Sequence, residues 1–228
     1  MTKYKEFLNI QNVIKINGIG VAMKAELRRQ HILDCAKKVF AEKGYYEAYV
    51  EDVIKVAHIG KGTIYEYFRN KEDLFLSLLI RSLEEWKRTV SISHQEIKTL
   101  DPVSYFRHRI KLTIIFLNND RELTSILLKT GFGFNPHIQK LIGEFEKNLR
   151  KHILHDLRLA KHLGVLRDGV DLQITTSILI GGLLMIAYQA ILSVPRLSEP
   201  EIDELTDKFM VTFIRGMFKP EFVNQYIN

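Results

Sequence analysis

Residues 61–74 read Lys-Gly-Thr-Ile-Tyr-Glu-Tyr-Phe-Arg-Asn-Lys-Glu-Asp-Leu, and this stretch decides the fold. Ile64 and Phe68 are four residues apart, so they share one face of a helix and leave polar and aromatic residues on the other. The preceding residues 50–57 have the apolar spacing of a second short helix, and His58-Ile-Gly60 interrupts the pattern. We expect Gly60 to take the left-handed conformation of a tight turn. The stretch therefore predicts two short helices joined by a turn.

Helices also flank this pair. Apolar residues recur at three- and four-residue steps over about residues 24–43, and Gly44 follows as a stop signal. Asn70 is a good N-cap, and the acidic residues after it suit the first turn of a fourth helix. Later helices are expected, with breaks at glycine and proline, over residues 103–118, 121–130, 137–163, 172–192 and 199–218.

The whole chain is therefore predicted to be all-α. Its 228 residues, 46% of them hydrophobic, are ample for a buried core. We expect an N-terminal arm over 1–23 that need not be ordered, a three-helix helix-turn-helix domain over 24–73 and a larger helical domain over 74–228. Met23 stands directly before the first strong helical pattern and is a candidate for the natural start.

Two short helices joined in this way have the dimensions for insertion into the major groove of DNA. The net charge of +6, with its excess of Lys and Arg mostly in residues 1–45, favours a polyanionic partner. Ordinary helical hairpins and solvated basic faces have the same features, however. Geometry and charge alone leave both interpretations open.

The sequence of this region resembles the TetR family of bacterial transcriptional regulators. The resemblance covers about fifty residues from Ile32 and is most specific in Gly62-Thr-Ile-Tyr-x-Tyr-Phe-x-x-Lys-Glu-x-Leu74. The rest of the chain is similar to that family only in its helical content and length. The resemblance implies a ligand-responsive repressor that binds a palindromic DNA operator as a homodimer and is released by a small effector.

The resemblance also implies a set of DNA-contacting residues. Gly62 permits a close approach to the duplex, and the hydroxyls of Thr63, Tyr65 and Tyr67 can meet phosphates or base edges. Lys61 can reach a guanine edge or a phosphate, and Lys71 can add its charge to the free amides of a helix start. The alternative for Tyr65 and Tyr67 is a packing role. The implied DNA-binding residues are Tyr49, Lys61, Gly62, Thr63, Tyr65, Tyr67 and Lys71.

The chain departs from the family pattern at four positions around the two short helices. Tyr49 stands where a threonine is common as cap and phosphate contact, and Ile54 replaces a small residue. His58 replaces the turn glycine, and Gly60 replaces a serine-type cap. These departures put the phosphate contact before the first short helix in doubt and leave the operator sequence open.

An uncharged stretch between Asp171 and Arg196 is expected to form the dimer interface together with the last helix. Its length and apolar character also fit a membrane span, but its polar residues and the lack of flanking Lys and Arg clusters argue against one. A helix buried between its own core and a partner subunit has the same composition. The candidate interface residues are Ile178, Gly181, Gly182, Phe209 and Phe213.

The remaining helices are expected to surround an effector cavity. Its candidate lining residues, for each of which ordinary core packing is the alternative, are Trp86, Phe106, Ile110, Thr113, Phe116, Phe145, Met185 and Tyr188. Their aromatic character favours a hydrophobic effector. We expect the effector to shift the population of the dimer away from the state that binds DNA.

The sequence contains no recognisable grouping of nucleophile, base and orienting residue, so we do not expect an enzyme. Cys35 is the single cysteine and lies on an apolar helix face, which fits a reducing cytoplasm and excludes a cysteine metal site. His152, His155 and Asp156 are better explained by a solvated charged face, so no metal or cofactor is expected. The alternatives left open are a helical enzyme without a DNA role and a membrane-anchored interaction protein.

Overall fold

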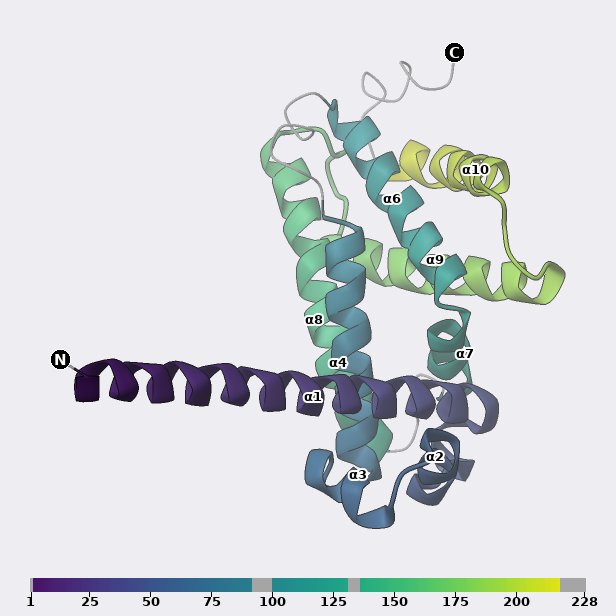
Figure 1. Ribbon diagram of the computed structural model, residues 1–228. Helices are drawn as coiled ribbons and strands as arrows, with labels where there is room; N and C mark the ends of the chain where they lie inside the picture. The colour runs from purple at the N-terminus through teal and green to yellow at the C-terminus, as the bar shows by residue number, and fades with distance from the viewer. Residues whose placement is uncertain (1, 92–99, 131–135, 218–228) are drawn as a thin grey trace. The chain divides into compact units, whose positions relative to one another are not determined.

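The computed structural model describes residues 2–91, 100–130 and 136–217. All regular structure in these ranges is helical, which confirms the predicted all-α class (Figure 1). The helices are α1 (Thr2–Glu47), α2 (Val50–Ala57), α3 (Lys61–Tyr67), α4 (Lys71–Thr89), α6 (Pro102–Asn119), α7 (Arg121–Thr130), α8 (Pro136–His162), α9 (Leu172–Ser193) and α10 (Glu199–Met217).

The chain divides into two compact units, Met1–Leu78 and Leu79–Asn228. The first unit contains α1, α2, α3 and the beginning of α4. Its core includes an aromatic cluster in which the ring of Phe75 lies 5.0 Å from Phe40 and 4.8 Å from Tyr45, measured between centroids. Such aromatic pairs stabilise a small domain beyond the area that they bury. This core holds the two short helices in place.

The N-terminal segment differs from its expected form. Residues 1–23 were predicted as a separate arm, but α1 begins at Thr2 and continues through this segment as helix. No proline lies between Thr2 and Glu47 to end the helix early. Helical geometry breaks only at Gly44, which has φ 74° and ψ 173° and was predicted as the stop signal.

One prediction about the turn between α2 and α3 is wrong. The left-handed residue is His58, with φ 52° and ψ 46°, whereas Gly60 is extended with φ −72° and ψ 151°. The turn needs its left-handed residue directly after the last residue of α2, where the His58 amide can bond back to the carbonyls of Ile54 and Lys55. Gly60 instead serves as the N-cap of α3.

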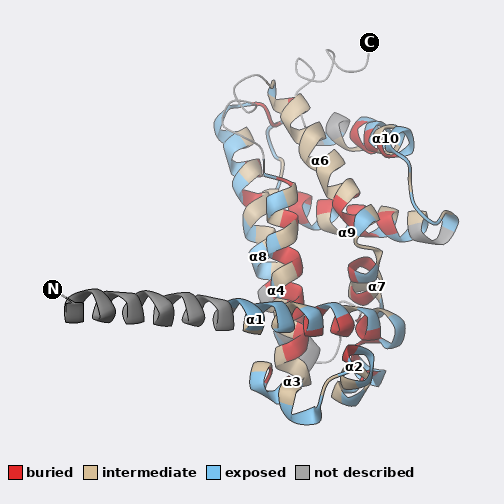
Figure 2. Ribbon diagram, viewed as in Figure 1, coloured by how far each residue is buried: buried red, intermediate tan, exposed pale blue. Residues whose placement is uncertain are grey.

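The second unit packs α6, α7, α8, α9 and α10 around an apolar centre, and buried residues face inward on each of these helices (Figure 2). Charged side chains add a specific pairing between α6 and α10. Arg107 Nε lies 2.7 Å from Asp207 Oδ1, and Lys111 Nζ lies 2.8 Å from Asp203 Oδ1. Each partly exposed pair stabilises the fold only slightly, but together the pairs join α10 to α6.

Candidate DNA interface and effector cavity

α3 presents a polar face because its two large apolar residues point inward. Ile64 and Phe68 are 1% and 3% exposed, as their four-residue spacing predicted. Lys61, Gly62 and Tyr65 are exposed, whereas Thr63 and Tyr67 are half-buried. The structure therefore brings five of the predicted DNA-contacting residues together on one short helix.

Gly62 has no neighbour that explains why it is a glycine. A Cβ atom built at this position would meet nothing within 4 Å, and the residue lies in regular helix. Inside a helix, glycine is less favourable than alanine by roughly 0.5–1 kcal/mol. The small side chain is thus not required by packing within the first unit, and it leaves room for a close approach from outside.

Lys61 forms an ion pair at the edge of this face. Its Nζ lies 3.1 Å from Glu51 Oε1, and both side chains are more than half exposed. This pairing raises the pKa of Lys61 and lowers the pKa of Glu51. Because exposed ion pairs are weak, the ammonium can exchange this carboxylate for another anion.

The ammonium of Lys71 is bound within the first unit. Its Nζ donates to the carbonyl oxygens of Tyr45 at 2.9 Å and Ala48 at 3.0 Å, and it lies 4.5 Å from the centre of the Tyr45 ring. Burial lowers the pKa of this ammonium. The side chain is therefore engaged with the end of α1.

Tyr49 is the N-cap of α2, but its side chain makes no capping hydrogen bond. Its backbone amide donates to Asp52 Oδ2 at 3.0 Å, and Asp52 also pairs with Lys43 at 2.8 Å. These two contacts lower the pKa of Asp52. The phenol ring of Tyr49 is 64% exposed and remains available on the surface of the first unit.

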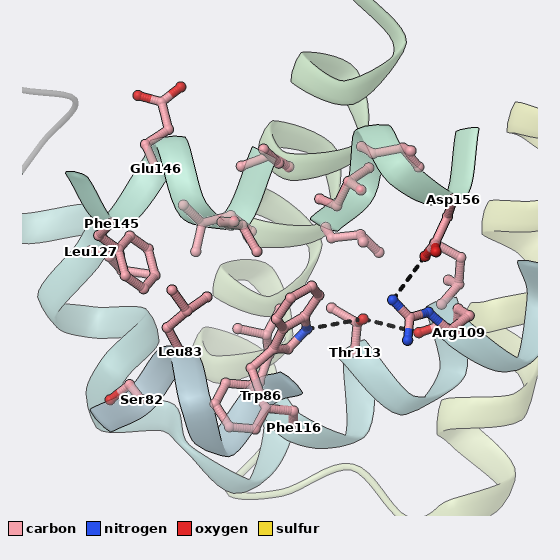
Figure 3. Close-up of a pocket in the computed structure, with 18 of the residues that line it drawn as sticks. Ser82, Leu83, Trp86, Arg109, Thr113, Phe116, Leu127, Phe145, Glu146 and Asp156 are labelled. Atoms are coloured by element: carbon pink, nitrogen blue, oxygen red, sulfur yellow. Dashed lines mark hydrogen bonds and ion pairs between the residues drawn. The ribbon is translucent and has the colours of Figure 1, made fainter. Parts of the chain in front are cut away.

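The second unit contains an apolar cavity of about 130 Å³ (Figure 3). Six of the eight predicted lining residues line it: Trp86, Phe106, Ile110, Thr113, Phe116 and Phe145. The other two, Met185 and Tyr188, do not, because they lie on the opposite side of α9 and are 50% and 38% exposed. The α9 residues that line the cavity are Leu179, Ile180, Leu183 and Leu184.

The cavity has a polar end that sequence reasoning missed. Arg109 Nη2 lies 2.8 Å from Asp156 Oδ2, and Arg109 Nη1 donates to the Val90 carbonyl. Next to this pair, Trp86 Nε1 donates to Thr113 Oγ1 at 3.3 Å (Figure 3). Burial and the neighbouring Asp156 raise the pKa of Tyr105. In the sequence, this polar end is indicated by Arg109, a charged residue among the apolar residues of α6.

A stripe of exposed apolar residues runs along α9. Ile174, Ile178, Met185 and Tyr188 are all exposed, and with Gly181 they follow alternating steps of four and three residues. This spacing places all five on one side of the helix, as in a coiled-coil seam. We call these five residues the α9 stripe.

Three further candidate interface residues are Gly182 of α9 and Phe209 and Phe213 of α10. A Cβ at Gly182 would lie 3.7 Å from Phe209 Cε2, which is ordinary van der Waals contact with a side chain of α10. The rings of Phe209 and Phe213 stack with centroids 5.4 Å apart. Phe209 is 9% exposed and therefore belongs largely to the core of the second unit.

α9 is also the helix whose composition raised the question of a membrane span. Residues 172–190 are long and apolar enough to cross a membrane by length and composition, and 33% of this window is buried inside the protein. The buried side includes Thr176, Leu179 and Leu183. A core helix with one uncovered face has the same length and composition.

Comparison with known proteins places the first unit in a family. Residues 32–78 match the family model described as bacterial regulatory proteins, tetR family. The HTH-type transcriptional regulator YhgD of Bacillus subtilis is 28% identical over 134 residues, which cover 55% of this chain and 65% of that relative. The fatty acid metabolism regulator protein of the same species is 25% identical over 154 residues, 66% of this chain and 76% of that protein.

A solved structure extends the likeness to the second unit. The transcriptional regulator FadR from Bacillus subtilis, in complex with stearoyl-CoA, matches with a TM-score of 0.67 and 22% identity, over 82% of this chain and 98% of that one. The two proteins share a fold. All three of these proteins are regulators rather than enzymes, as the sequence predicted of this chain. Residues 32–78, which include the helix-turn-helix, thus match the tetR family of bacterial regulatory proteins.

Proposed function

We propose that this protein is a transcriptional repressor of the bacterial cytoplasm. It binds a palindromic operator as a symmetric dimer and is released by a small hydrophobic effector. The observation that carries the proposal is the polar, exposed face of α3 behind inward-pointing Ile64 and Phe68. A helix with this division of residues can enter the major groove while it remains anchored to its own domain.

Each residue of the proposed DNA-binding set acts through a different chemistry. Gly62 lets the start of α3 approach the backbone of the duplex, and Thr63, Tyr65 and Tyr67 offer hydroxyls. Lys61 exchanges Glu51 for a phosphate, and the exposed Tyr49 contacts the backbone beside it. Lys71 acts indirectly because it holds the end of α1 against the start of α4.

A palindromic operator has two half-sites and therefore requires two DNA-binding domains. A dimer supplies the second one. Specific recognition by helix-turn-helix proteins uses two half-sites about one helical turn, roughly 34 Å, apart. The α9 stripe supports the dimer because it leaves an apolar seam uncovered in a single chain. Two such seams packed around a two-fold axis cover each other, with Gly181 and Gly182 allowing close approach.

The cavity is the proposed effector site. Its lining is apolar and aromatic, which suits a hydrophobic molecule, and the FadR structure that shares this fold holds stearoyl-CoA. α4 links the site to the recognition helix, because only three residues separate it from α3 and it carries Ser82, Leu83 and Trp86 into the lining. An effector that favours one position of α4 thereby changes the affinity for DNA.

A gel shift with double-stranded DNA from upstream of the protein's own gene tests the DNA-binding proposal. Tyr65→Phe removes only a hydroxyl, and Tyr46→Phe is its matched control because Tyr46 is equally exposed but lies outside α3. We expect roughly tenfold weaker binding for Tyr65→Phe together with Thr63→Ala, and unchanged binding for Tyr46→Phe. Equal binding by all three proteins would exclude α3 as the reading helix.

A further inference from the structure

Aromatic side chains form a large part of the wall of the effector cavity. They come from α4, α6 and α8 and are Trp86, Tyr105, Phe106, Phe116 and Phe145. Aromatic rings attract one another edge to face or in offset stacks, beyond the effect of the area that they bury. A rigid ring also loses less conformational freedom on binding than a flexible chain does. The wall therefore favours a ring.

The polar groups at one end of the cavity are bonded to each other. Arg109 Nη2 lies 2.8 Å from Asp156 Oδ2, and Arg109 Nη1 donates to the Val90 carbonyl. Trp86 Nε1 donates to Thr113 Oγ1 at 3.3 Å (Figure 3). An ionic group of a ligand that bound to Arg109 or Asp156 would have to compete with the other member of this pair.

Two other polar residues of the wall do not offer their polar atoms to the cavity. Glu146 points away from it and pairs with Arg150 at 2.9 Å (Figure 3). The Ser82 hydroxyl has no accessible surface and also points away. The charged residues of the described lining are thus all paired within the protein. An ion of either sign would lose its water in the cavity and gain no uncommitted partner there.

The volume limits how much of a ligand can be buried. An apolar cavity of roughly 150 Å³ holds one benzene molecule. At about 130 Å³, the present cavity accepts a group of similar size. Any longer or charged part of an effector would have to extend beyond it.

Building on the proposed function, we propose that the part of the effector buried in this cavity is a single uncharged aromatic ring. The ring lies among the aromatic and aliphatic side chains of the wall. It leaves the pair of Arg109 and Asp156 intact. The cavity discriminates against the same ring when it carries a charge of either sign.

Three probes that share one ring test this inference by isothermal titration calorimetry on the full chain. They are toluene, benzoate and benzylammonium. We expect toluene to bind at least about tenfold more tightly than either ion at neutral pH, because neither ion regains in the cavity what it loses in water. Trp86 is the single tryptophan of the chain and lines the cavity, so its fluorescence should change when toluene binds.

A matched pair of substitutions places the ring in this cavity. Leu83 lines the cavity and Leu154 does not, although both leucines are buried. Leu83→Phe fills part of the space, so it should weaken toluene binding about tenfold or more without lowering the melting temperature. Leu154→Phe adds the same atoms where the lining offers no space. It should melt at a lower temperature and keep its affinity for toluene.

Two results would overturn the inference and leave the proposed function standing. One is benzoate or benzylammonium binding as tightly as toluene, and the other is unchanged toluene binding by Leu83→Phe. If toluene does not bind although the protein still shifts operator DNA, this inference is wrong and the DNA-binding proposal stands. Because calorimetry uses no DNA, loss of the DNA shift alone would contradict only the DNA-binding proposal.

Discussion

Lys71 helps to form the helix-turn-helix domain although its ammonium points into the first unit. The carbonyls of Tyr45 and Ala48 lie in and directly after the last turn of α1, and Lys71 Nζ donates to both of them. Hydrogen bonds to charged groups contribute about 1.5–3 kcal/mol. We expect Lys71→Met to lower the free energy of unfolding in urea by about this amount, whereas Lys55→Met at an exposed position of α2 should change it little. A Lys71→Met protein of full stability that fails to bind DNA would instead indicate a direct contact.

Tyr45 makes the stability of the first unit sensitive to alkaline pH. Burial and the neighbouring Glu72, which accepts a hydrogen bond from the phenol at 3.1 Å, raise the pKa of Tyr45 above its ordinary value. The unfolded chain releases this proton near pH 10, whereas the folded chain retains it. The contribution of the protonated Tyr45 phenol to the free energy of unfolding is therefore complete below about pH 10 and is lost as the pH rises further. Between about pH 9 and pH 11, urea titrations should show that the free energy of unfolding falls more steeply with pH for the parent protein than for Tyr45→Phe.

Spacing within one helix predicted where single residues point, but not which distant residues they meet. Ile64 and Phe68 were assigned to the inner face from their four-residue separation, and the structure confirms both. The acceptors of Lys71 lie more than twenty positions earlier in the chain. Likewise, Ser82 and Asp156 reach the cavity only because α4 and α8 both contribute to its wall. Periodicity contains no information about such pairings.

The turn between α2 and α3 shows strain that a single substitution can relieve. His58 adopts the left-handed conformation, which costs a residue with a Cβ atom roughly 1–2 kcal/mol. Glycine has no such cost in this conformation, although it loses more entropy on folding. We expect His58→Gly to raise the free energy of unfolding by up to about 1 kcal/mol. His58→Val should lower it, because branched side chains tolerate this conformation least.

The bounds of the helices were largely predictable because local chemistry sets them. Asp101 and Asp171 each accept hydrogen bonds from two amides at the beginning of a helix, and both stand where a predicted helix begins. Two local features were assigned incorrectly. The left-handed position was given to Gly60 because glycine favours it, but the bonding pattern after α2 places it at His58. The helix over residues 2–23 was not predicted, because polar residues interrupt the apolar ones there: Asn9, Gln11, Asn12, Lys15 and Asn17.

Assembly of two chains depends on the α9 stripe. A charge within the stripe would be buried in the dimer without a partner, and this is strongly unfavourable. We expect Met185→Glu to give a monomer in analytical ultracentrifugation and to lose operator binding. Gln173→Glu is the matched control, because it adds the same charge at an exposed position about 100° around α9 from Ile174. Dimers in both variants would place the interface elsewhere.

The sequence showed that residues 172–192 are uncharged, but it did not distinguish a core helix from an interface or a membrane span. Those alternatives differ only in what covers each face of α9. The structure shows that one face packs inside the second unit and that the α9 stripe does not. For the same reason, Met185 and Tyr188 were assigned to the cavity although they lie on the uncovered side. Apolar composition predicts that a residue is covered, not which element covers it.

α4 contains neither glycine nor proline from Lys71 to Thr89, and it lies between the recognition helix and the cavity in the chain. Bends in helices almost always occur at such residues or at helical irregularities, so α4 should behave as a stiff rod. A helix that does not bend transmits a displacement of one end to the other end without local unfolding. Amide hydrogen exchange along α4 should therefore stay equally slow whether or not the cavity is filled.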